Sequence, residues 1–161
     1  MLAYHLGCSK DGDDAVGEKD TRRGYIDTDE NEFSIKNIEL LKKAQEEILW
    51  LLDRDYPIKN VVTFVGNRYM LSNRQRLALM RATSPTASVA ERKRKEVSSC
   101  GRQVVSIDGF NLIITLEVAL SGSTLIKCMD GTIRDLIDTM EHRPLKTPAA
   151  YMRNDKHGQK A

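Results

Sequence analysis

Two aspartates in the second half of the chain stand where side chains often do chemistry. Asp108 follows the β-branched run Val-Val-Ser-Ile and precedes an apolar segment that Asn111 can cap as a helix begins. In an open α/β sheet such a junction opens at the carboxyl edge of a strand, where ligands usually bind. Asp130 repeats the arrangement after a second candidate strand, residues 124–128. The alternative for each Asp-Gly pair is that it only forms a turn.

Glu117 is the third acidic candidate, because it is the one charged residue in the apolar segment from Leu112 to Leu120. A carboxylate in such a segment needs a partner, a metal ion or a solvated cleft. Carboxylate oxygens suit the hard cations Mg²⁺ and Mn²⁺, which can activate water for hydrolysis. We therefore predict Asp108 and Glu117 as catalytic residues, and Asp108 and Asp130 as ligands of Mg²⁺ or Mn²⁺.

A cluster of arginines precedes these carboxylates in the chain. Residues 57–103 contain ten Lys and Arg against two Asp and Glu, whereas residues 104–138 contain two against five. The forked guanidinium group suits phosphate and carboxylate. The cluster predicts contacts with RNA phosphates, and salt bridges to the first helix are the alternative. The predicted nucleic-acid-binding residues are Arg68, Arg74, Arg76 and Arg81.

Three helices are expected to carry these arginines. Apolar residues at steps of three and four predict a helix over residues 34–54. Residues 57–69 fit the same period, although their β-branched content would also suit a strand. Ser72 and Gln75 form a capping box that predicts a third helix to about Arg81. These segments indicate a small helical bundle.

The carboxylates are expected on a different kind of unit. Residues 104–107 and 124–128 read as strands, each followed by an Asp-Gly turn and a helical pattern, the second beginning near Thr132. A βαβα order implies parallel strands with a right-handed crossover, which would bring Asp108 and Asp130 to one edge. The predicted fold class is α+β, with an N-terminal helical bundle followed by a short βαβα unit that has a parallel sheet.

The chain divides by composition into five parts. The first is acidic and the last basic, and both lack periodicity, so we expect both to be disordered. A charged stretch rich in Ser, Lys and Arg marks the boundary between the two folded parts. The predicted parts are a leader (1–33), a helical module (34–83), a basic linker (84–102), an α/β unit (103–141) and a tail (142–161).

Composition also limits the class of protein. With 40% hydrophobic and 30% charged residues, the chain is expected to be soluble and globular. It lacks an apolar run of membrane-spanning length and a signal pattern, so we expect no membrane and a cytoplasmic location. Three widely spaced cysteines without a Cys-x-x-Cys pair indicate neither a disulfide framework nor a zinc site.

Several motifs carry a resemblance to a known family. They are Asp-Tyr-Pro-Ile-Lys-Asn (55–60), Gly-Asn-Arg-Tyr (66–69), Ser-Asn-Arg-Gln-Arg (72–76), Ile-Asp-Gly-Phe-Asn (107–111) and Asp-Gly-Thr-Ile-Arg-Asp (130–135). Over roughly residues 34–137 the chain resembles uncharacterised prokaryotic proteins that join domain-of-unknown-function family 434 to a second unnamed domain. That family implies no established activity. Residues 107–111 are also similar to the first strand of PIN-like and NYN nucleases, whose opening aspartate helps bind a divalent metal for RNA cleavage.

The chain departs from such nucleases after residue 138. Their domains need further strands and later acidic residues, and the residues from 103 onward are few for an independent core. Either another chain completes the domain, or this copy is shortened and inactive. We predict a metal-dependent ribonuclease-like protein, and the alternative is a non-catalytic nucleic-acid-binding or protein-interaction module. Uncovered apolar surface and open strand edges further predict a homo-oligomer at micromolar concentration.

Overall fold

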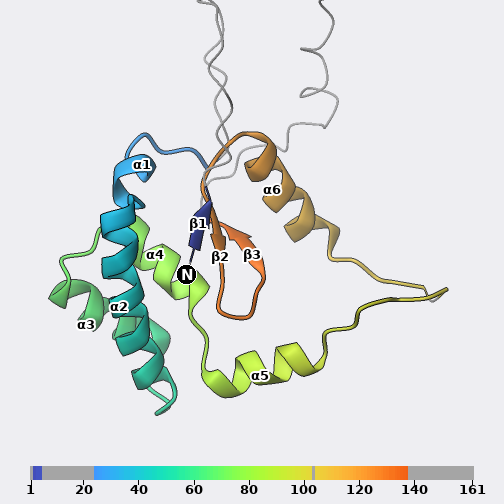
Figure 1. Ribbon diagram of the computed structural model, residues 1–161, viewed down its shortest axis with the longest axis horizontal. Helices are drawn as coiled ribbons and strands as arrows, with labels where there is room; N and C mark the ends of the chain where they lie inside the picture. The colour runs from blue at the N-terminus through green and yellow to red at the C-terminus, as the bar shows by residue number, and fades with distance from the viewer. Residues whose placement is uncertain (1, 5–23, 103, 138–161) are drawn as a thin grey trace, which may run out of the picture.

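The computed structural model describes residues 2–4, 24–102 and 104–137. Helices dominate this part of the chain, and a small sheet lies between the helical module and the helix that follows the long connection (Figure 1). In chain order the elements are β1 (Leu2–Tyr4), α1 (Asp29–Glu32), α2 (Ile35–Leu52), α3 (Ile58–Arg68), α4 (Asn73–Ala82), α5 (Thr86–Arg94), α6 (Gly109–Leu120), β2 (Leu125–Lys127) and β3 (Ile133–Asp135).

Helices α2, α3 and α4 form the helical module, and they match the three helices predicted from the sequence. Residues 58–68 are helical despite their β-branched content, because Val61, Val62 and Val65 fall on one buried face. Helix α4 begins at the predicted capping box: Ser72 Oγ accepts from the Gln75 N–H at 3.1 Å, and Gln75 Oε1 accepts from the Ser72 N–H at 3.1 Å.

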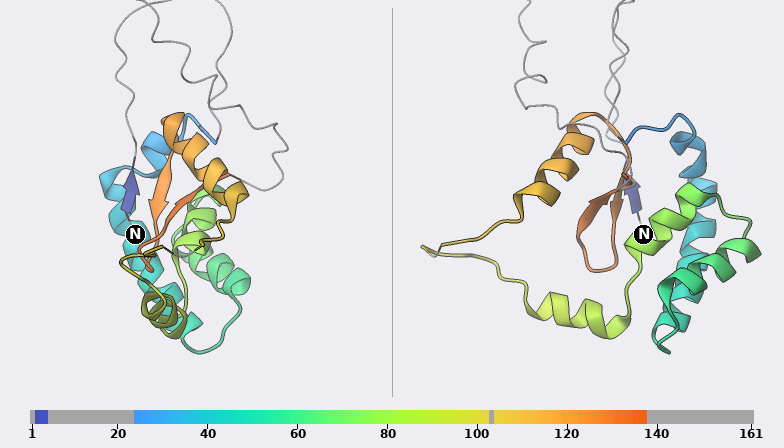
Figure 2. Two further views of the ribbon diagram at one scale, coloured as in Figure 1. Left: turned by 90° about the vertical axis from the view of Figure 1, so that its right-hand side faces the viewer. Right: turned by 180° about the vertical axis from the view of Figure 1, so that it is seen from behind.

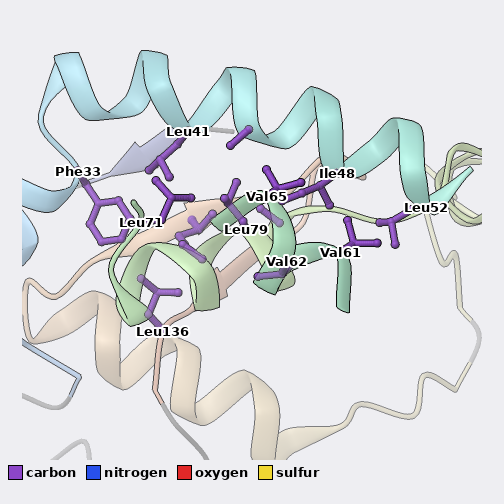
Figure 3. Close-up of a cluster of buried hydrophobic side chains, with 14 residues drawn as sticks. Phe33, Leu41, Ile48, Leu52, Val61, Val62, Val65, Leu71, Leu79 and Leu136 are labelled. Atoms are coloured by element: carbon purple, nitrogen blue, oxygen red, sulfur yellow. The ribbon is translucent and has the colours of Figure 1, made fainter. Parts of the chain in front are cut away.

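The main core lies inside this module and extends to the sheet. Leu41, Ile48 and Leu79 are fully buried, and side chains from α2 point toward those from α3 and α4 (Figure 3). Ile126 of β2 and Leu136, just after β3, belong to the same cluster. The sheet therefore completes the core of the module, and one side of it belongs to the same core as the helices.

The predicted parallel βαβα unit is wrong. The described sheet has the order β1–β2–β3, and both pairings are antiparallel. Residues 104–107 form no strand, whereas residues 133–135, predicted to lie in a helix, form β3. The third strand, β1, comes from the N-terminal segment, where Leu2 pairs with Lys127.

The turn between β2 and β3 explains the antiparallel arrangement. Cys128 N–H donates to Thr132 O at 2.9 Å, and Asp130 Oδ1 accepts from the Thr132 N–H and hydroxyl at 3.1 and 2.6 Å. Gly131 has a φ of +87°, a conformation that favours glycine. Antiparallel strands can be joined by so short a turn, whereas parallel strands need a crossover of about a dozen residues or more. Asp130-Gly131 is thus a hairpin turn, the alternative reading of this motif.

The segments outside the helical module differ in how they attach to it. Parts of the predicted leader are described: β1 joins the sheet, and α1 contains the buried Asp29. Within the predicted linker, α5 has no buried residue and is held at its start by Asp53, whose carboxylate accepts from Thr86 N–H and Oγ1 at 2.7 Å each. The chain then runs away from the helices and sheet before returning to α6 (Figure 2). The predicted tail lies outside the described residues.

A second, smaller cluster of apolar residues lies between α6 and the sheet. It consists of Val118, Leu125 and Ile137, with Ile114 and Ala119 packed against it. Because α6 packs on the sheet through one side only, its other side remains on the surface.

No helix in the described residues is long and apolar enough to cross a membrane.

Candidate functional site

Arg74, a predicted RNA contact, is a buried structural residue in this fold. Its Nε and Nη2 donate to the two carboxylate oxygens of Asp29 at 3.0 and 2.9 Å. It also donates to Leu136 O at 2.5 Å and to Gly24 O at 2.8 Å. The side chain is 11% exposed and that of Asp29 is 1% exposed. Arg74 therefore ties α1 and the residue after β3 to the helical module.

Arg81 has a similar structural role at the end of β3. Its Nη1 donates to Asp135 O at 2.7 Å and to Asp135 Oδ1 at 3.0 Å, and its Nη2 donates to Ile137 O. The other carboxylate oxygen of Asp135 accepts from Thr115 Oγ1 of α6 at 3.3 Å. Asp135 therefore links α4 to α6, and Arg81 neutralises its charge.

Arg68, at the end of α3, pairs with the first long helix, as the alternative reading proposed. Its Nη1 lies 3.4 Å from Glu47 Oε1, and the arginine side chain remains largely exposed. The Tyr69 hydroxyl donates to the same Glu47 oxygen at 2.7 Å. This hydrogen bond to a carboxylate raises the pKa of Tyr69 above its ordinary value.

Arg76 differs from the other three because all its hydrogen-bond acceptors are neutral. Nε donates to Leu71 O at 2.9 Å, and Nη1 donates to Asn67 Oδ1 at 2.9 Å and Thr63 O at 3.4 Å. Within the part of the chain that the structure describes, Arg76 has no carboxylate partner, and Nη2 donates no hydrogen bond. The guanidinium is thus fixed in place while its charge stays uncompensated.

Gly66 makes this position of Arg76 possible. A Cβ atom at residue 66 would lie 2.9 Å from Arg76 Nε and 3.0 Å from both Cγ and Cζ. Only glycine leaves room for the arginine to cross the α3 backbone at this closeness. Arg76 is therefore packed against α3 and does not extend freely into solvent.

The exposed side of α3 surrounds Arg76 with polar residues. We call this surface the α3 face, and it also carries Phe64, which is 69% exposed. No Asp or Glu occurs between Asp55 and Glu91 in the sequence, so the residues nearest in the chain contribute only positive charge. Arg76 reaches this face through its hydrogen bonds to Thr63 O and Asn67 Oδ1, and the face consists of Lys59, Asn60, Thr63, Phe64 and Asn67.

The predicted acidic residues occupy three different environments. Asp108 is exposed at the N-terminus of α6, where its Oδ2 accepts from Asn111 Nδ2 at 2.7 Å. Glu117 is buried on α6. Asp130 lies in the β2–β3 turn, and its Oδ2 accepts from Arg92 Nη1 at 2.6 Å. Only a parallel sheet would bring Asp108 and Asp130 to one edge, and the described sheet is antiparallel.

The Asp130 carboxylate has a structural role, because it accepts hydrogen bonds from Thr132 and Arg92. Burial opposes ionisation of its carboxyl group, but the hydrogen bonds from Thr132 and Arg92 outweigh that effect and hold the pKa below its ordinary value. Among the residues that the structure describes, no group of three or more His, Cys, Asp and Glu side chains could hold a metal ion. The predicted Mg²⁺ or Mn²⁺ site stays a prediction.

Sequence reasoning missed the carboxylates that matter most to the fold. Asp29, Asp53 and Asp135 neutralise or cap groups on α4 and α5, yet the sequence alone does not predict these partners. Asp29 falls within the predicted leader, because residues 1–33 lack periodicity. The signal that could have found them is the cluster of arginines, since a buried guanidinium needs an acidic partner.

Comparison with known proteins gives two family matches. Residues 40–95 match the protein family of unknown function DUF434, and residues 97–148 match the domain of unknown function DUF5616. An uncharacterised protein of Methanocaldococcus jannaschii is 33% identical over 97 residues, which cover 59% of this chain and 47% of that protein. The chain thus spans about half the length of this relative.

No solved structure matches the chain. The resemblance to PIN-like and NYN nucleases stays a prediction, because neither matching family carries a described activity. The predicted joining of two domains of unknown function is confirmed. The segment that matches DUF434 contains most of the helical module, and the following segment that matches DUF5616 contains α6 and the β2–β3 hairpin.

Proposed function

We propose that this chain is a non-catalytic module that binds single-stranded nucleic acid through the α3 face and Arg76. The observation that carries the proposal is the Arg76 guanidinium, which is held by neutral acceptors and has no carboxylate partner in the described structure. A charged group in that position attracts an anion, and the free Nη2 donors can bind phosphate oxygens.

The fixed position of Arg76 favours binding. A flexible surface arginine loses side-chain entropy when it contacts a ligand, at a cost of about 0.5–1.5 kcal/mol. Arg76 has already lost much of that freedom, because three intramolecular hydrogen bonds and the contact with Gly66 hold it. Lys59 adds a second positive charge to the same face.

Phe64 supports a nucleic acid as the ligand in preference to a small anion. It is one of the most exposed large apolar side chains of the helical module, and it stands beside the polar ridge of Lys59, Thr63 and Asn67. Stacking of a base on an exposed aromatic ring contributes about 1–3 kcal/mol and tolerates any sequence. The exposed ring of Phe64 offers a stacking surface for a base on the same helix against which Arg76, a contact for a phosphate, is packed.

A salt titration tests the proposal. Fluorescence polarisation of a labelled oligouridine should give an affinity that falls with salt. Arg76→Gln should weaken binding and reduce the slope of log affinity against log salt by about one unit, the effect of one lost phosphate contact. Phe64→Ala should weaken binding by about tenfold without changing the slope.

Lys42→Gln is the matched control, because it removes one positive charge from an exposed position on α2, away from the α3 face. Equal losses in Lys42→Gln and Arg76→Gln would indicate general attraction to a basic protein and would contradict a defined site. No binding at low salt would also contradict the proposal. Thermal unfolding of each variant checks that the fold is retained.

The metal-dependent ribonuclease predicted from Asp108, Glu117 and Asp130 has less support. Asp130 is bonded to Arg92 and Thr132, and Glu117 is buried on α6. The same titration with Mn²⁺, followed by gel analysis of the RNA, tests it directly. Cleavage by the wild type that disappears in Asp108→Asn would favour the nuclease over the non-catalytic module.

A further inference from the structure

We infer that the exposed side of α6 is the interface of a symmetric dimer with a second copy of this chain. The side of α6 that faces away from the sheet carries leucines at steps of four residues, each about half exposed or more. We call this surface the α6 face, and it consists of Leu112, Ile113, Leu116 and Leu120.

The opposite side of α6 is largely apolar as well, although it also carries Thr115, which bonds to Asp135, and the helix buries Glu117. Val118 is buried, and Ile114 and Ala119 pack with it against Leu125 and Ile137. A helix that is apolar around its whole circumference is normally buried on every side. Helix α5 provides the contrast, because it has no buried residue and exposes mainly charged side chains in its second half. The composition of α6 therefore fits a helix covered on both sides.

The area available is that of a stable interface. The exposed apolar side chains continue from α6 into the segment just before it, which includes Val104, fully exposed. Side chains of this size contribute about 100 Å² each when roughly half to fully exposed. Together they approach the roughly 800 Å² per partner of a standard interface. They are Val104, Val105, Ile107, Phe110, Leu112, Ile113, Leu116 and Leu120.

A second copy fits the α6 face because that face carries no charged residue, and the exposed Asp108 lies outside it, just before the helix. In a two-fold symmetric contact each patch meets its own copy, so a patch with net charge repels itself. None of the α6 face residues is charged, and the charged residue within the helix, Glu117, is buried elsewhere on its circumference. The face is therefore complementary to itself.

The spacing of the leucines gives the expected geometry. Leu112, Leu116 and Leu120 form a ridge of the i, i+4 kind, and two such ridges interlock at a crossing angle of about −50°. Leu116 lies at the middle of the ridge, so it should lie nearest the two-fold axis. Leu112 would then pack near Leu120 of the partner subunit.

Light scattering after size exclusion tests the dimer. Wild-type protein at micromolar concentration should have the mass of a dimer, and Leu112→Lys combined with Leu116→Lys should have the mass of a monomer. Ile35→Lys is the matched control, because Ile35 is an apolar residue on α2 that is 83% exposed. It should remain dimeric. Circular dichroism checks that each variant keeps its helices.

Cross-linking tests the geometry separately. In a background of Cys8→Ser and Cys100→Ser, Leu116→Cys should form a disulfide-linked dimer under a mild chemical oxidant such as copper phenanthroline, and Ile35→Cys should not. A wild-type monomer at tens of micromolar would overturn the inference. So would a dimer that survives the double lysine substitution, because its interface would lie elsewhere. Neither result bears on the nucleic-acid proposal, whose site is on α3.

Discussion

Helices α2 and α6 both carry many apolar residues, but they differ in how those residues are used. Helix α2 buries Leu41, Ala44, Ile48 and Leu52 along one side and exposes charged residues on the other. Helix α6 is more apolar than α2, yet the only apolar side chain it buries fully is Val118. An amphipathic helix buries its apolar side chains by packing one side. A helix that is apolar on both sides leaves apolar side chains exposed when only one side packs.

This difference separates two tasks in the molecule. The helical module holds most of the buried core and should provide most of the stability. The sheet attaches to it through Ile126 and Leu136, through the hydrogen bond from Arg74 to Leu136 O, and through the ion pair of Arg81 with Asp135. Helix α6 rests on the far side of that sheet and contributes little to the core, so its sequence is free to serve an interface.

The largest effect is expected where the N-terminal segment and the end of β3 join the module. Asp29→Ala should lower the free energy of unfolding by about 3–5 kcal/mol, because it leaves the buried Arg74 charge without its partner. Urea denaturation measures this loss. Glu30→Ala, at an exposed position in the same helix, should change stability by no more than about 0.5 kcal/mol. Equal effects of the two substitutions would mean that the buried pair does not attach α1 to the module.

Truncating one apolar side chain in each helix tests the difference between α2 and α6. Ile48→Ala in α2 should cost about 2–5 kcal/mol, since the side chain is fully buried in the main core. Leu116→Ala in α6 should cost no more than about 0.5 kcal/mol at concentrations low enough to keep the chain monomeric. A large loss for Leu116→Ala under those conditions would show that the α6 face is covered within a single chain.

The parts of the fold that sequence could predict depend on local signals. The helical module follows from apolar periodicity and from the Ser72 and Gln75 capping box, which act over a few residues. The sheet could not be predicted, because Leu2 pairs with Lys127 across most of the chain and no local pattern encodes that contact. The Asp130-Gly131 motif is compatible with either a strand-to-helix junction or a hairpin, and the pairing of β2 with β3 decides between them.

The candidate site was predictable only in part, for a related reason. Arg74 and Arg76 are two residues apart in one helix and look alike in sequence. In the fold they lie on different sides of α4, so that Arg74 meets Asp29 and Arg76 crosses Gly66. Which arginine is neutralised depends on where a distant carboxylate lies. Sequence could therefore identify the cluster but not the arginine whose charge has no carboxylate partner.

The N-termini of α4 and α6 also differ, and this difference predicts a smaller effect on the free energy of unfolding. Ser72 caps α4 with its side chain, whereas Asp108 at the start of α6 makes no side-chain cap to the backbone. Ser72→Ala should therefore cost about 1 kcal/mol, and Asp108→Ala should cost less. Chemical denaturation of the two variants side by side measures the difference. A greater loss for Asp108→Ala would give that residue a structural role that its described contacts do not explain.

The smallest effect concerns the attachment of α5 to the module and depends on pH. Hydrogen bonds from the Thr86 side chain and then its backbone N–H lower the pKa of Asp53 below the ordinary value of 3.8. Because the folded-state pKa is depressed, the contact stabilises α5 fully above the ordinary value and is lost as pH falls through the lower, folded-state pKa. The Thr86 amide resonance should therefore stay constant from neutral pH to about pH 4. It should shift below that range, and Asp53→Asn should abolish the shift. A shift that persists in Asp53→Asn would assign the acid sensitivity of this junction to another carboxylate.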